Sequence, residues 1–189
     1  MKNSAALKLA AEHFRDPVKF ARNILRHDTW PVQEAILRAI RDYPRVAVKG
    51  CHGSSKTFTI ADAVLWWLAR WPDAVVVTTG PSWTQVREIV WGEIRKAVAR
   101  SIFRFPAPTQ TELRLANGAH AIGLSTDEAV RFQGFHGEHL LVIVDEAPGL
   151  RGEIWEAIPG ARCRPASMWP KRARRKPYWL CGKAQNCSS

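Results

Sequence analysis

The sequence predicts an α/β fold in which a mainly parallel sheet is flanked by helices. A short β-rich run at 45–48 passes through a loop of small residues into a helical stretch at 57–70. Continuous apolar runs follow at 74–79 and 139–144, and such runs are typical of parallel strands buried on both faces. Strands that alternate with helical segments favour one α/β sheet over separate helical and strand layers.

The remaining elements follow from apolar spacing. Amphipathic helices are expected within 5–26, the second starting at Pro17, and over 32–42 after a Trp-Pro turn. Residues 83–100 give the clearest helical pattern, because their apolar side chains share one face. Asn117-Gly118 predicts a two-residue hairpin turn that leads into a segment at 119–124.

Length and composition point to a single domain inside the cell. The chain has 189 residues, which is enough for one core and short for two. No apolar run approaches the roughly 18 residues of a membrane span, and charged residues interrupt the N-terminal stretch, so neither a transmembrane helix nor a secretory signal is expected. Four cysteines without paired spacing suggest no disulfide scaffold. We therefore expect a cytoplasmic protein that does not bind membranes.

The positive charge is concentrated at the C-terminal end. The net charge is +11, but residues 159–189 carry eight Lys or Arg side chains and no acid, which leaves 20 basic and 17 acidic residues before them. The same segment has four prolines and no sustained apolar period. We expect a domain at 1–158 and an extended or disordered basic tail at 159–189 that builds no core element. Its basic cluster at 171–176 is able to attract phosphate backbones, although so short a run more often stays solvated.

The loop at 50–57 fits the phosphate-binding pattern G-x-x-x-x-G-K-[ST], with Ser55 where the last glycine is usual. Small residues let successive backbone N–H groups surround a phosphate, and the next helix presents its positive N-terminus to the same charge. Lys56 is then placed to bridge β- and γ-phosphate oxygens, and Thr57 to bind Mg²⁺ through its hydroxyl. The alternative is a flexible turn with a solvated lysine.

Two acids end the last apolar run. Asp145 is expected to hold Mg²⁺ through its water shell, and Glu146 to polarise the water that attacks the γ-phosphate. An ordinary strand-end turn is the alternative, which the phosphate loop earlier in the chain makes less favoured. The sequence therefore predicts ATP and Mg²⁺ as cofactors.

With these motifs in place, residues 14–158 resemble the large (motor) subunit of tailed-phage terminases. The similarity rests on residues 30–33, on the phosphate loop with its Gly-Ser-Ser-Lys-Thr ending, on residues 78–86, and on the block at 131–139 that runs into the acid pair. That block is more similar to a terminase than to a generic helicase. Terminases use ATP hydrolysis to drive double-stranded DNA into a procapsid, and a separate C-terminal nuclease domain cuts the concatemer.

The resemblance implies a P-loop NTPase fold and assigns roles. Gln33, in a segment similar to the family's adenine-recognition motif, would read the base, with a helix-surface glutamine as the alternative. Arg131 would stabilise charge near the γ-phosphate, with a plain loop arginine as the alternative. Asp145 and Glu146 match the Walker B positions. The residues that match the Walker A positions are Gly50, Gly53, Ser54, Ser55, Lys56 and Thr57.

The resemblance stops after the Walker B strand. The family continues with a helix, a strand that carries the coupling motif and the nuclease domain, whereas residues 159–189 resemble nothing in it. We therefore expect a truncated ATPase domain, with a sheet that lacks the strand beside Walker B and with no nuclease activity. The partners implied are double-stranded DNA, the small terminase subunit, the portal or procapsid, and further copies in a ring. A helicase or translocase fragment of superfamily 2 type and a non-functional prophage remnant are the alternatives.

Overall fold

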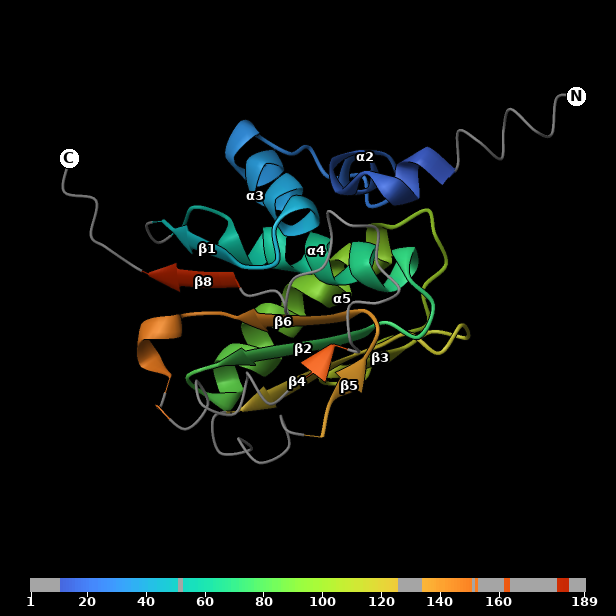
Figure 1. The fold of residues 1–189 in the computed structure, drawn as a ribbon. Helices are drawn as coiled ribbons and strands as arrows, with labels where there is room; N and C mark the ends of the chain where they lie inside the picture. Colours follow the sequence, from blue (N-terminus) through green and yellow to red (C-terminus); the bar gives the residue numbers. More distant parts are fainter. Residues whose placement is uncertain are drawn as a thin grey trace, which may run out of the picture.

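The computed structural model describes residues 11–50, 53–125, 134–150, 152, 162–163 and 180–183. Its centre is a four-stranded sheet with the order β3-β4-β2-β6 (Figure 1). In this sheet β2 (Val75–Gly80) lies parallel to both β4 (His120–Ser125) and β6 (Leu140–Val144), and β3 (Glu112–Arg114) pairs antiparallel with β4. Every residue of β2 and β6 is buried, as the continuous apolar runs predicted. The mainly parallel α/β architecture is confirmed.

Four α-helices of the described chain surround this sheet: α2 (Pro17–Asn23), α3 (Pro31–Asp42), α4 (Lys56–Arg70) and α5 (Trp91–Arg100). The central one is α4, which is buried continuously from Thr59 to Leu68 and contacts each of the other three. Its interior position explains why its sequence has almost no polar face. No helix among the described residues is long and apolar enough to cross a membrane.

The helix predicted at 83–100 begins with an unusual turn. Residues Gln85–Val90 form a π-helix, η1, and α5 follows without a break. The N–H of Trp91 accordingly bonds to the carbonyl of Val86, five residues earlier. π-turns are rare and occur frequently at functional sites, because the extra residue re-aims the side chains around it.

The strand that leads into the phosphate loop lies apart from the four-stranded sheet. β1 (Val46–Lys49) pairs in parallel with β8 (Leu180–Lys183), from Val46 opposite Leu180 to Lys49 opposite Lys183. β8 lies between β1 and β6 (Figure 1). A second short strand near the C-terminal end, β7 (Arg162–Cys163), pairs in parallel with β5 (His136–Gly137).

These pairings correct two expectations about the tail. The sequence predicts that the segment 159–189 builds no core element and that the sheet lacks a strand beside Walker B, yet β8 occupies that position. A parallel ladder needs only backbone N–H and C=O groups, and four residues are too few to show a side-chain period. The other tail residues lie outside the described chain.

Candidate nucleotide-binding site

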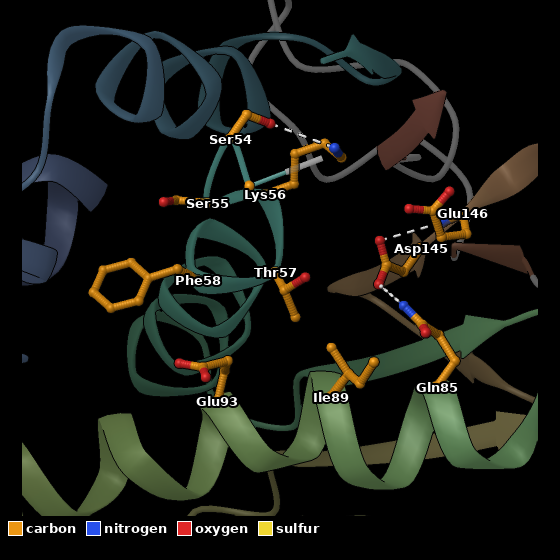
Figure 2. A pocket seen from close by; sticks show the side chains of 11 residues that line it. Ser54, Ser55, Lys56, Thr57, Phe58, Gln85, Ile89, Glu93, Asp145 and Glu146 are labelled. Carbon is orange, nitrogen blue, oxygen red and sulfur yellow. Dashed lines mark hydrogen bonds between the residues drawn. The ribbon is translucent and has the colours of Figure 1, made fainter. Parts of the chain in front are cut away.

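A cleft of about 560 Å³ opens where the parallel strands end (Figure 2). Residues 53–58, which follow β1 and begin α4, form one side, called here the P-loop wall. Asp145 and Glu146, which follow β6, form the other with Gln85, which comes after β2; these three are called the acid wall. Ligands of open α/β sheets bind at this carboxyl edge. The cleft thus lies where such a fold places a ligand.

The P-loop wall depends on left-handed backbone at two positions. Gly53 has φ +74°, and Ser55, just before α4, has φ 56° and ψ 27°. A side chain in this conformation costs roughly 1–2 kcal/mol, which is why glycine is usual at the position of Ser55. The serine keeps the glycine-like geometry: its carbonyl accepts from the N–H and the hydroxyl of Thr59, both at 3.1 Å. The departure from the motif leaves the turn intact.

Lys56, the first residue of α4, lies over this loop. Its Nζ donates to the carbonyl of Gly50 at 3.1 Å and to Oγ of Ser54 at 3.4 Å. A Cβ on Gly50 would stand 3.0 Å from that Oγ, so a small residue is needed for the loop to close under the lysine. The ammonium group is thereby held inside the cleft by acceptors of the loop itself.

The acid wall is buried and fixed. Asp145 is 3% exposed, and its N–H donates to the Thr79 carbonyl at 2.8 Å, which extends the β2–β6 pairing. One carboxylate oxygen, Oδ2, accepts from Nε2 of Gln85 at 3.0 Å, and the other, Oδ1, accepts from the N–H of Glu146 at 3.2 Å. Burial raises the pKa of Asp145, and the Gln85 hydrogen bond opposes this shift.

Glu146 is turned by its backbone. Its φ of 50° is left-handed, and a short 3₁₀ helix, η3 (Ala147–Gly149), follows at once. Figure 2 shows Glu146 beside Asp145, across the cleft from Thr57 and Lys56. A sharp turn directly after the strand therefore keeps both carboxylates at the same edge.

The oxygen donors of the two walls fit Mg²⁺. Thr57 supplies a hydroxyl and Asp145 a carboxylate, which are the ligand types that Mg²⁺ prefers. Each oxygen of Asp145 accepts one N–H, so the carboxylate, with about four lone-pair sites, keeps acceptor capacity for a metal-bound water. Across the described residues, no three His, Cys, Asp or Glu side chains gather as a metal-binding group. The chemistry points to a partly hydrated cation rather than to an all-protein cage.

Two predicted site residues are not found in the cleft. Gln33 does not line it; its side chain is 3% exposed, and its Oε1 accepts from the N–H of Trp30 at 3.1 Å, which caps α3. Gln33 is therefore not a surface glutamine, and its contact with a base stays a prediction. Arg131 lies outside the described residues.

The structure adds residues that the sequence did not single out as functional. Gln85, Ile89 and Glu93 line the cleft from one face of η1 and α5. Their spacing of four residues, directly after the carboxyl end of a buried strand, was the signal that could have identified them. Only Gln85 among them touches a predicted site residue through a hydrogen bond in the described chain.

Buried charges support the P-loop wall from behind. Phe58, the last residue of this wall, packs with its ring centroid 4.0 Å from that of His27, and the Arg100 guanidinium lies 5.3 Å from the Phe58 ring. Nδ1 of His27 pairs with Asp62, both side chains being fully buried, and Nε2 of His27 meets Arg100. Because arginine only donates, the network assigns the ring proton to Nδ1. The first turn of α4 is thus tied to α5 and to the segment after α2.

The fold and the cleft define the class: a P-loop-type α/β nucleotide-binding domain. No protein-family profile and no curated protein matches the sequence. Among solved structures, the HK97 bacteriophage large terminase matches with a TM-score of 0.68 at 19% identity, over 91% of this chain and 38% of that chain. The ATPase domain of the Thermus phage P74-26 large terminase gives 0.63 at 23% identity, over 87% and 69%. A large terminase from a thermophilic bacteriophage, in complex with ADP, gives 0.55 at 14% identity, over 90% and 37%.

The particular fold is therefore that of phage large terminase ATPase domains. At these identities the likeness establishes the fold, and it agrees with the resemblance carried by the sequence motifs. The chain spans 38% of the length of the HK97 large terminase.

Proposed function

We propose that this chain is the ATP-binding motor domain of a tailed-phage DNA-packaging terminase, in which ATP hydrolysis drives movement of double-stranded DNA. One observation carries the proposal: Lys56 and the Asp145–Glu146 pair, far apart in the sequence, line a single cleft at the carboxyl edge of a terminase-type sheet. The large terminase that was solved in complex with ADP supports a nucleotide as the ligand.

The walls divide the chemistry. The small residues of the P-loop wall and the N-terminus of α4 bind the phosphates, and Lys56 exchanges Gly50 and Ser54 for β- and γ-phosphate oxygens. Thr57 and Asp145 would hold Mg²⁺, which supplies charge neutralisation on the phosphates. Glu146 orients a water molecule and accepts its proton as the water attacks the γ-phosphate.

The remaining expectations belong to the whole protein and are proposals here. They are base recognition by Gln33, charge stabilisation by Arg131, action in the host cytoplasm, assembly into a ring, and binding to double-stranded DNA, the small terminase subunit and the portal or procapsid. No feature of the described residues favours a superfamily 2 helicase over a terminase.

Equilibrium binding of a fluorescent ATP analogue with Mg²⁺ tests the nucleotide site. Lys56→Ala should weaken binding about 10- to 100-fold, because a charge-assisted hydrogen bond contributes about 1.5–3 kcal/mol. Lys19→Ala is the matched control, since Lys19 lies exposed on α2 and pairs with Glu12. Equal binding by the wild type and Lys56→Ala would reject the site. ATPase activity that rises on addition of double-stranded DNA would then identify a motor rather than a passive binder.

A further inference from the structure

We propose that Gln85 is a positioning residue that aims the Asp145 carboxylate at the metal position. This inference rests on the proposed function, because the metal position has meaning only in a Mg²⁺-nucleotide site. The observation behind it is the 3.0 Å hydrogen bond from Nε2 of Gln85 to Oδ2 of Asp145, which joins a residue after β2 to a residue after β6.

Gln85 is the donor that fixes the carboxylate from outside its own strand. The N–H of Asp145 holds the backbone to Thr79, but this bond leaves the side-chain torsions free. The Glu146 N–H reaches Oδ1, yet it belongs to the next residue and moves with the same backbone. Among the bonds to Asp145 in the described residues, the Gln85 bond therefore limits rotation of the carboxylate relative to the rest of the cleft.

The approach of Gln85 requires a glycine at the end of β2. A Cβ on Gly80 would lie 3.3 Å from Cγ of Gln85 and 3.6 Å from the carbonyl oxygen of Asp145. The first of these distances is tighter than ordinary contact, so a side chain here would push the glutamine stem away. Gly80, Gln85 and Asp145 thus fit together as one packed unit.

The backbone of Gln85 is held as well. Its N–H donates to Oγ of Ser82 at 3.2 Å, and it is the first residue of the π-helix η1. A π-turn changes the direction of its side chains relative to a regular α-helix. The glutamine is therefore presented to Asp145 by a constrained turn and not by a free helix end.

An amide suits this position better than a cation. Lys or Arg beside Asp145 would neutralise the carboxylate and compete with Mg²⁺ for it. The neutral amide donates one hydrogen bond and leaves the negative charge available to the cation. The choice of residue is therefore consistent with positioning, whereas an ion pair would favour a purely structural role.

The test measures Mg²⁺ dependence of nucleotide binding. Gln85→Met removes the donor and keeps the length; Gln110→Met is the matched control, because Gln110 is exposed and its side chain does not line the cleft. A fluorescent ATP analogue is titrated in EDTA and over a range of Mg²⁺ concentrations. Gln85→Met should raise the Mg²⁺ concentration for half-maximal effect about 10-fold or more and leave binding in EDTA within about twofold, since partners of metal ligands typically change metal affinity 10- to 100-fold.

Gly80→Ala provides an independent variant, since it crowds the glutamine stem but keeps the amide. It should raise the half-maximal Mg²⁺ concentration in the same direction, by less than Gln85→Met does. An unchanged Mg²⁺ requirement in Gln85→Met, or equal weakening with and without Mg²⁺, would overturn the positioning role. A wild type that binds the analogue with no response to Mg²⁺ would instead reject the proposed function itself. Gln85→Asn, one methylene shorter, replaces Gln85→Met if circular dichroism shows that the latter is unfolded.

Discussion

The two walls of the cleft differ in how firmly they are built. The P-loop wall is half-exposed, has left-handed backbone at Gly53 and Ser55, and holds its lysine with acceptors of the loop itself. The acid wall follows a completely buried strand, and Asp145 is hydrogen-bonded to three residues from different elements or positions. The difference teaches that the phosphate-binding side adapts to its ligand, whereas the metal-binding side is preorganised.

The strands explain this difference. β2 and β6 are buried at every position, so the residues that follow them start from a fixed base. β1 alternates between half-buried and exposed residues, so the P-loop wall starts from a strand with one open face. Substitutions in the acid wall should therefore change chemistry and stability together, and those in the P-loop wall should change mainly binding.

Glu146→Gln should give the largest effect and separates chemistry from binding. The amide keeps the shape of the side chain but cannot accept a proton from water, so the ATPase rate should fall about 10²- to 10⁴-fold. Single-turnover hydrolysis measures the rate, and binding of the fluorescent analogue should change little. Glu138→Gln is the control, because Glu138 is exposed ahead of β6. A variant that hydrolyses ATP at the wild-type rate would remove Glu146 from the mechanism.

Asp62→Ala tests whether the P-loop wall owes its shape to the buried charges behind it. Removing one partner of a buried pair leaves His27 and Arg100 without their carboxylate, and the free energy of unfolding should fall by about 3–5 kcal/mol. Urea unfolding measures the change. Glu12→Ala breaks an exposed pair with Lys19 and should cost about 0–1 kcal/mol. Similar losses in the two variants would show that the buried network adds nothing special.

Asp145→Asn should stabilise the nucleotide-free protein while it damages metal binding. Because burial raises the pKa of Asp145, the folded protein holds this proton more tightly than the unfolded chain, and the stability linked to it is lost as the pH rises. The asparagine does not titrate, so the gain, about 1 kcal/mol, should be larger at about pH 7 than at about pH 4.5. Thermal unfolding at both values tests this. A gain that is the same at both would contradict the linkage.

Ser55→Gly should have the smallest effect. Glycine relieves the left-handed strain of roughly 1–2 kcal/mol, but it also gives the unfolded chain more freedom, so a net gain of a few tenths to about 1 kcal/mol is expected. The serine side chain makes no capping hydrogen bond to α4, so no bond of that kind is lost. Ser54→Gly is the control on the same loop. Destabilisation by Ser55→Gly, measured by urea unfolding, would show that the serine hydroxyl supports the turn in another way.

The sequence was informative where local chemistry decides the structure. The buried runs that became β2 and β6 need no partner to be recognised, because a strand covered on both faces must be apolar throughout. The phosphate loop is similarly constrained by what it binds, so its residue types alone were enough to place Lys56 and the acid pair in one site.

The features that sequence reasoning missed depend on distant contacts. Gln85 becomes relevant through a hydrogen bond to a residue of another strand end, and the π-turn that presents it has no sequence pattern of its own. Asp62 interrupts an apolar helix, and nothing nearby in the sequence shows that His27 lies against it. β8 is too short to show a period, and its position comes from backbone pairing alone.

The ladder between β1 and β8 also affects the order of events during synthesis. The strand before the phosphate loop is made early, but its partner leaves the ribosome only after all four strands of the central sheet. Closing so long a connection is slow, since its entropy cost precedes any gain from pairing. A nascent chain would therefore complete its central sheet first and acquire a rigid grip on nucleotide only once β8 has emerged.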